Sequence, residues 1–204
     1  KSDKLEDYAS SLARVASLSN LFSESKTPFI HYRATEYLYA RVLEAKNLAR
    51  SDIAIDAKRG AFGVGLKTFV YTGRPKYEKI AEFNKEIASF DQLDPLPKIK
   101  AVAKLRNERI DFAGRLTGTN TFIYHCIARL PGKLFIFETL MPHIDIDHIV
   151  ITDIKGKNIS FTDRIDNYRF NSSKSTLFKE FYGKKGLFEK RVTMYEDPYK
   201  VLQT

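Results

Sequence analysis

Residues 31–69 concentrate side chains that could do chemistry. Among them the carboxylic acids Glu36, Asp52 and Asp56 precede Lys67 on what the spacing marks as neighbouring elements. Carboxylate oxygens are the ligands that Mg²⁺ prefers, and an ammonium group beside the ion can orient a water or stabilise charge on a phosphorane. The residue types therefore predict metal-dependent phosphodiester hydrolysis, with the three acids as metal ligands and Lys67 assisting the attacking water.

The elements that must position these groups are a helix and a hairpin. The apolar residues of a helix expected over about 34–49 recur at three- or four-residue spacing: Leu38, Val42, Ala45 and Ala49. This helix carries Glu36 near its start. Alternation over 52–56, a turn containing Gly60 and an apolar run over 63–71 predict two antiparallel strands directly after it.

The register of this hairpin decides whether the acids meet the lysine. A turn at Gly60 sets Asp52 opposite Lys67, and the same register sets Asp56 opposite Gly63. Since side chains alternate with a period of two, these positions share one face of the sheet. Two carboxylates and a lysine then converge, and the helix glutamate can bring a third carboxylate to the same place.

This arrangement resembles the PD-(D/E)XK nuclease superfamily, which includes many type II restriction endonucleases. In that family a helix glutamate, an aspartate at the start of one strand and an acid-x-Lys on the next strand form the metal site. Here residues 51–52, Ser-Asp, stand where the family has Pro-Asp, and residues 65–67, Gly-Leu-Lys, stand where it has acid-x-Lys. The resemblance covers residues 31–71 and departs from the family at Gly65, which supplies no carboxylate.

The departure at Gly65 leaves several interpretations open. Asp56 or Glu36 takes over as the missing ligand, or the site is catalytically inactive. A rival register uses residues 56–58 as the acid-x-Lys element, although Asp52 then lies four residues earlier on the same strand, far along it for sharing a metal. In the simplest alternative the two aspartates face solvent and Lys67 pairs with one of them. The glycine itself could keep the sheet surface open for a ligand backbone.

The charge of the chain points to a polyanionic partner. Lys and Arg number 34 against 25 acidic residues, which gives a formal net charge of +9 and a pI near 9.5. Beside the acids, Arg33 and Arg50 are expected to contact phosphates. Residues 167–176 mix amide, hydroxyl, aromatic and cationic groups, and within them the expected nucleic-acid contacts are Asn171, Ser173 and Lys174. Ordinary turn chemistry is the alternative explanation for that segment.

The fold class expected is mixed α+β, with a helical N-terminal half packed on a mixed β-sheet and a β-rich C-terminal half. Further helices are predicted over about 3–22, 77–90 and 98–116, and further strands over 122–130, 133–140, 148–154, 159–161 and 187–195. We expect one nuclease-like domain over 1–204, with a possible β-rich DNA-recognition subdomain over about 120–200.

The expected function is a Mg²⁺-dependent endonuclease that cuts double-stranded DNA, sequence-specifically and as a homodimer, since both strands of a palindrome need two sites related by a two-fold axis. The single cysteine, Cys126, lies in an apolar run, which predicts a buried thiol and a reducing, cytoplasmic setting. No apolar run is long enough for a bilayer, so no membrane partner is expected. The alternatives are a non-catalytic nucleic-acid-binding module with a degenerate nuclease fold, and a protein-interaction domain of a larger assembly.

Overall fold

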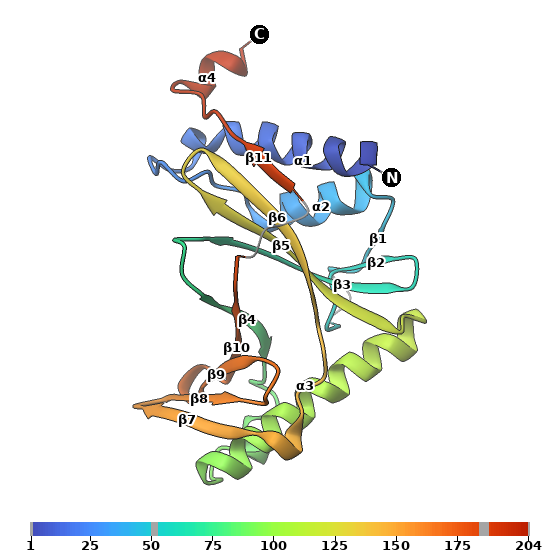
Figure 1. Cartoon of the computed structure of the whole chain (residues 1–204), viewed down its shortest axis with the longest axis vertical. Helices are drawn as coiled ribbons and strands as arrows, with labels where there is room; N and C mark the ends of the chain where they lie inside the picture. The colour runs from blue at the N-terminus through green and yellow to red at the C-terminus, as the bar shows by residue number, and fades with distance from the viewer. Residues whose placement is uncertain (1, 50–52, 184–187, 204) are drawn as a thin grey trace. The chain divides into compact units, whose positions relative to one another are not determined.

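The chain folds into two units in a computed structural model that describes residues 2–49, 53–183 and 188–203. Unit 1 comprises residues 1–74, 114–141 and 183–204, and unit 2 comprises residues 75–113 and 142–182. The described residues form helices and two β-sheets joined by loops (Figure 1). The mixed α+β class expected from the sequence is therefore confirmed. The strands of the β-rich C-terminal half divide between the units, because β5, β6 and β11 belong to unit 1 and β7 to β10 to unit 2.

Unit 1 is built on a six-stranded sheet of order β1-β2-β3-β5-β6-β11. Its strands are β1 (Lys46–Asn47), β2 (Ala57–Arg59), β3 (Phe62–Val70), β5 (Thr121–Leu130), β6 (Lys133–Leu140) and β11 (Phe188–Arg191). The central pair β3 and β5 is parallel and the other pairs are antiparallel. A parallel pair needs a long crossover connection, and the connection from β3 to β5 contains the first segment of unit 2.

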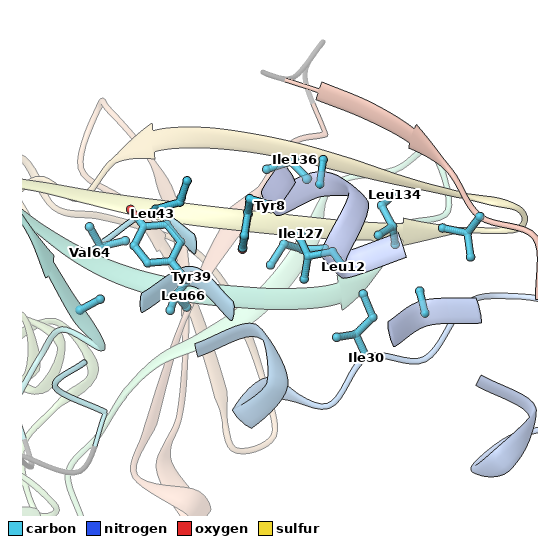
Figure 2. Packing of buried hydrophobic residues seen from close by; sticks show 14 of the residues in the cluster. Tyr8, Leu12, Ile30, Tyr39, Leu43, Val64, Leu66, Ile127, Leu134 and Ile136 are labelled. Atoms are coloured by element: carbon cyan, nitrogen blue, oxygen red, sulfur yellow. The ribbon is translucent and has the colours of Figure 1, made fainter. Parts of the chain in front are cut away.

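Two helices cover one face of this sheet, α1 (Ser2–Ser17) and α2 (Tyr32–Val42), as Figure 1 shows. They are accompanied by the short helices η1 (Ser19–Leu21) and α4 (Pro198–Val201). The apolar core between helices and sheet draws on every central strand (Figure 2) and includes Tyr8, Leu12, Tyr39, Val64, Leu66, Ile127, Leu134 and Ile136. Removing one such leucine or isoleucine side chain costs about 2–5 kcal/mol, so this core holds α2 in place.

The second helix is shorter than its apolar stripe predicts, because it ends at Val42 rather than Ala49. Glu44 adopts a left-handed backbone with φ of 54°, which stops the helix. Residues 46–47 then form β1 and pair with β2. At the other end the Nδ1 atom of His31 accepts a hydrogen bond from the backbone N–H of Arg33 at 3.2 Å and caps the helix.

A polar cluster lies against the core of unit 1, with His125 fully buried and Glu138 and Arg59 partly buried. Nδ1 of His125 on β5 lies 3.0 Å from Oε1 of Glu138 on β6, which also accepts a hydrogen bond from Arg59 at 3.2 Å. The rings of Tyr8 and Tyr39 meet the fully buried imidazole edge-on, with centroids 5.4 and 4.8 Å away. Burial lowers the pKa of His125, although the carboxylate of Glu138 acts in the opposite direction. The imidazole is therefore neutral near pH 7 and donates from Nδ1 to the carboxylate.

Unit 2 is built on an antiparallel five-stranded sheet of order β4-β10-β9-β8-β7. Its strands are β4 (Lys76–Glu82), β7 (Val150–Lys155), β8 (Asn158–Thr162), β9 (Asn167–Asn171) and β10 (Thr176–Phe181). Its short helices are η2 (Ile87–Ser89), η3 (Ile146–His148) and η4 (Ser172–Lys174). The long helix α3 (Pro95–Thr117) passes from unit 2 to unit 1 after Ala113. Residues of α3 and of the sheet form the core, including Phe83, Ile99, Val102, Phe161, Phe170 and Leu177.

The helix predicted over 77–90 is wrong, because the structure has strand β4 and the short helix η2 there. Strand β4 pairs with β10, a partner nearly a hundred residues later in the chain. Its local spacing is compatible with either element, and pairing with β10 decides between them. The helix over 98–116 and the strands over 63–71, 122–130, 133–140, 148–154 and 159–161 are confirmed within a few residues, whereas only residues 188–191 of the last predicted strand form β11.

The side chain of Cys126 is fully buried in the middle of β5, as its apolar surroundings predict. Within the described part of the chain, no helix has the length and apolar character needed to cross a membrane.

The buried imidazole predicts a pH-dependent stability. An unfolded histidine binds a proton around its ordinary pKa of 6.5, whereas folding lowers the pKa of His125. The unfolded state then binds more protons, so the free energy of unfolding falls as pH drops from about 7.5 to 5.5, by up to about 1.4 kcal/mol per pH unit. Chemical denaturation at several pH values should show a steeper decrease in the wild type than in His125→Gln.

The test compares how steeply the free energy of unfolding changes with pH in the two proteins, because the substitution also changes packing at every pH. Glu138 has a lowered pKa, since its bonds to His125 and Arg59 outweigh burial, and its own contribution disappears only in more acidic solution. Parallel slopes for the two proteins between pH 7.5 and 5.5 would show that His125 titrates normally in the folded state.

Candidate functional site

Glu36 lies on the sheet side of α2, one helical turn before Tyr39. Its side chain is buried, as are those of Thr35 and Tyr39. One carboxylate oxygen, Oε2, accepts a hydrogen bond from Nη1 of Arg33 at 3.1 Å, and the two residues are three positions apart on the helix. The buried side of α2, which includes Thr35, Glu36 and Tyr39, thus contains an acid whose own cation lies one turn earlier on the helix.

Asp56 lies directly before β2 and is tied to β3. Its Oδ2 atom accepts a hydrogen bond from the backbone N–H of Leu66 at 2.7 Å, and its own N–H donates to the carbonyl of Val64 at 2.8 Å. The carboxylate therefore takes the place of a main-chain acceptor at the end of the strand pair. Half of the carboxylate, the Oδ1 atom, has no hydrogen bond from any described residue.

The predicted hairpin register is wrong by two residues. Lys58 rather than Asp56 lies opposite Gly63. The reason is the tight turn at Gly60, which has φ of 61° and joins strands that pair as far as Arg59 and Phe62. A shift of two residues preserves the alternation of side chains, so the argument that brought Asp56 towards Lys67 survives the correction.

Electrostatics joins these residues into one group, which we call the acid cluster: Arg33, Glu36, Asp56 and Lys67. Burial raises the pKa of Glu36, and the negative charge of Asp56 raises it further against the hydrogen bond from Arg33. Burial likewise raises the pKa of Asp56, opposed by the hydrogen bond from Leu66 and by the charges of Lys67 and Arg33. Asp56 thus interacts with each of the other three residues of the cluster.

Lys67 extends from β3 on the side opposite Val64 and Leu66, whose side chains enter the core. Its ammonium nitrogen lies 5.9 Å from the ring centroid of Tyr124, on the neighbouring strand β5. The charge of Lys67 lowers the pKa of Asp56, so the two residues interact. That the whole predicted set forms one site stays a prediction.

Two predicted site residues, Arg50 and Asp52, lie outside the described residues. Among the residues that are described, no set of three acidic, histidine or cysteine side chains is arranged to hold a metal. The acid cluster therefore offers two protein carboxylates. Mg²⁺ is commonly held in proteins by one or two carboxylates, with water and substrate phosphate completing its shell.

The rival assignment of residues 56–58 as the acid-x-Lys element finds no support in the position of Lys58. Its ammonium group donates to the carbonyl of Thr117 at 2.5 Å, at the C-terminus of α3. Gly118, with φ of 66°, follows that helix end. A cation there satisfies an otherwise unpaired carbonyl and the negative end of the helix dipole, so Lys58 has a structural role.

Gly65, where the family has an acid, is enclosed by side chains rather than open. A Cβ atom built at Gly65 would lie 2.7 Å from Cε of Met141 and 3.1 Å from Cδ1 of Tyr124. Gly63 is enclosed in the same way, with Cδ1 of Phe122 2.7 Å from its Cβ position. Aromatic residues of β5 thus cover the glycines of β3 in register, and the expected open surface for a ligand backbone is absent at Gly65.

The three nucleic-acid contacts expected in the C-terminal half lie around the short helix η4 in unit 2. Asn171 caps this helix: its Oδ1 accepts from the N–H of Lys174 at 3.0 Å and from the hydroxyl of Ser173 at 2.9 Å. Its amide nitrogen donates to Asn158 at 2.8 Å. Turn chemistry therefore accounts for Asn171, while Ser173 and Lys174 are exposed and their role in binding stays a prediction.

A set of exposed side chains on α2 escaped the sequence argument. Arg33, Tyr37 and Arg41 follow one another at four-residue spacing on the outer side of the helix. The signal available in the sequence was the four-residue spacing of Arg33, Tyr37 and Arg41. Arg33 was predicted to contact phosphate, whereas Tyr37 and Arg41 were not among the predicted residues.

Comparisons with known proteins do not add to this picture. No family model, no curated protein and no solved structure matches the chain.

The glycine contacts predict an order of stabilities. Gly63→Ala should lower the free energy of unfolding by about 1–3 kcal/mol, because the ring of Phe122 must move as a whole and also packs against Gly114. Gly65→Ala should cost less, since the terminal methyl of Met141 can rotate away. Urea denaturation of both variants measures the difference. A larger cost at Gly65 would contradict this account of the β3–β5 packing.

Proposed function

We propose that the protein is a Mg²⁺-dependent endonuclease that hydrolyses phosphodiester bonds of double-stranded DNA in a sequence-specific manner. The observation that carries this proposal is the acid cluster, in which Asp56 at a strand end interacts electrostatically with Glu36 of α2, with Lys67 and with Arg33. Two acids and two cations at one place suit a divalent ion and a phosphate group. The resemblance to PD-(D/E)XK nucleases supports the same chemistry.

The donor set of the cluster fits a magnesium ion. Oε2 of Glu36 and Oδ2 of Asp56 accept hydrogen bonds, and their other oxygens, Oε1 and Oδ1, have no hydrogen bond from the described residues. The raised pKa of each carboxyl reflects burial without full compensation by cations. A bound divalent cation would supply the missing charge, polarise a phosphate oxygen and lower the pKa of a bound water.

The remaining residues of the cluster have roles that follow from their charge. Lys67 is the group that would hold the attacking water or stabilise the charge that develops on phosphorus, because its ammonium donates in several directions. Arg33 opposes the rise in the pKa of Glu36 through their hydrogen bond and leaves part of its side chain exposed for a phosphate oxygen. Asp52, predicted as a further ligand, and Arg50, a predicted phosphate contact, complete the proposed set.

The charge distribution supports nucleic acid as the partner. The residues of unit 1 include 20 Lys and Arg against 12 Asp and Glu, a net charge of +8, whereas unit 2 has 14 against 13, a net charge of +1. The unit that contains the acid cluster thus carries nearly all of the excess positive charge. A reducing, cytoplasmic setting and a homodimer with two-fold related sites belong to the same proposal, the first supported by the buried Cys126.

One observation favours a second candidate function, a non-catalytic nucleic-acid-binding module. Gly65 holds the position of the family's second acid, and the side chains of Tyr124 and Met141 occupy the space where that acid would lie. In this alternative the basic unit 1 binds nucleic acid, and the acid cluster has lost its hydrolytic activity.

Cleavage assays on mixed plasmid and phage DNA distinguish the two candidates. We expect discrete fragments with Mg²⁺ and intact DNA with EDTA. Glu36→Gln, Asp56→Asn and Lys67→Met should each lower the cleavage rate by about 100-fold or more, as expected for the loss of a positioned catalytic group. The same assay on Asp52→Asn tests the ligand predicted from the sequence alone.

Matched controls are Glu108→Gln and Lys104→Met, which change an exposed pair 4.0 Å apart on α3 in unit 2 and should leave cleavage unchanged. The two acid variants in the cluster should melt at the same or a higher temperature than the wild type, since each removes a buried charge. Retained DNA binding without cleavage by the wild type would support the binding module. If neither occurs, the nucleic-acid proposal fails.

A further inference from the structure

The outer side of α2 carries exposed aromatic rings held beside arginines. Tyr37 is 55% exposed, and its hydroxyl accepts a hydrogen bond from Nη1 of Arg41 at 3.0 Å, with the guanidinium 5.9 Å from the ring centroid. At the start of the helix, Tyr32 is 51% exposed and has the guanidinium of Arg33 5.0 Å above its ring. We call Arg33, Tyr37 and Arg41 the outer row.

The outer row has a geometry suited to an extended, anionic ligand. Its three residues are spaced four positions apart, so they follow one line along the helix over roughly 12 Å. Arg41 has no acidic partner within ion-pair distance among the described residues, and Arg33 shares its charge with Glu36. The row therefore presents a positive charge at one end, an exposed ring in the middle and a partly neutralised guanidinium at the other end.

The chemistry of the row discriminates between kinds of nucleic acid. A tyrosine ring offers its face to a base, and stacking requires a base whose own face is accessible. The bases of a duplex are stacked on one another, so an exposed ring gains little from them, whereas an unpaired nucleotide can stack and place its phosphates near Arg33 and Arg41. The net charge of +8 on unit 1 favours a polyanion at this surface over a neutral or basic partner.

The position of the row connects it to the acid cluster. Glu36 immediately precedes Tyr37 in the helix, and Arg33 belongs to both groups. A strand whose phosphates lie at Glu36 would pass its next nucleotides over the outer side of α2.

We infer that the outer row of α2 binds unpaired nucleotides, so that the preferred substrate of the acid cluster is nucleic acid with a single-stranded segment beside the bond that is cut. The part concerning cleavage rests on the proposed nuclease function, whereas the binding surface does not. DNA and RNA share the chemistry that the row recognises, base faces and phosphates, and the experiment separates them.

Fluorescence anisotropy in EDTA measures binding without cleavage. The probes are a labelled single-stranded oligodeoxynucleotide, the duplex of the same sequence, the matching RNA, and a strand of equal length in which abasic sites replace the central bases. We expect the wild type to bind the single strand more tightly than the duplex and the abasic strand. Tyr37→Leu should weaken binding of the single strand about tenfold, within the range for one lost base stack, and leave the abasic strand unaffected.

Arg41→Gln should weaken binding of every probe and lower the slope of binding against salt by about one, since it removes one phosphate contact. The matched controls are Tyr199→Leu, an exposed tyrosine of α4, and Arg115→Gln, an exposed arginine near the end of α3; both should bind as the wild type does. If RNA binds more tightly than DNA under these conditions, the outer row still binds unpaired nucleotides and the substrate is RNA.

Three results would overturn the inference: equal binding of single strand and duplex by the wild type, equal binding of the abasic and intact strands, or wild-type affinity of Tyr37→Leu. A change in oligomeric state of Tyr37→Leu with unchanged oligonucleotide binding would assign the row to a protein contact instead. Failure of the nuclease proposal is distinguishable, because the acid cluster can prove inactive while the row binds single strands. Cleavage of a substrate with a single-stranded segment that is unaffected by Tyr37→Leu would reject the row alone.

Discussion

The structure of unit 1 depends on strand β3, which has to satisfy different neighbours on its two faces. Val64 and Leu66 enter the core beneath α1 and α2, while Gly63 and Gly65 receive aromatic rings from the parallel strand β5. The backbone of the same strand supplies the N–H that holds Asp56. Because register fixes which side chains reach which face, a one-residue slip of β3 would remove the core, the ring contacts and the acid cluster together.

The acid cluster and the buried histidine illustrate two ways of keeping charge inside one unit. Glu138 is bonded to both His125 and Arg59, and its pKa is lowered, so its negative charge is well compensated. Glu36 and Asp56 have raised pKa values despite their own partners. In the first arrangement two partners compensate the carboxylate, whereas the second retains a demand for positive charge, which is the property expected of a site for a cation or substrate.

The outer side of α2 adds a second kind of chemistry to the same helix. Its inner side delivers Glu36 to the acid cluster, and its outer side displays Tyr37 and Arg41. A short amphipathic helix can serve both purposes because positions three or four apart share a side while adjacent positions diverge. A strand bound by the outer side of α2 and cut at the acid cluster on its inner side, as proposed, would then be positioned by one rigid element.

The sequence by itself determined the elements whose signal is local. The periods of α1, α3, β3, β5 and β6, the turn at Gly60 and the residue types of Glu36, Asp56 and Lys67 were readable without coordinates, and they predicted that these side chains converge. Only the tertiary structure decided that 76–82 is a strand, because its partner β10 is remote, and that the hairpin register is shifted by two. It also decided that Tyr124 and Met141 fill the space at Gly65. The partner of 76–82 and the packing at Gly65 depend on contacts between residues far apart in the chain, which local spacing does not encode. The register depends on the exact position of the tight turn at Gly60.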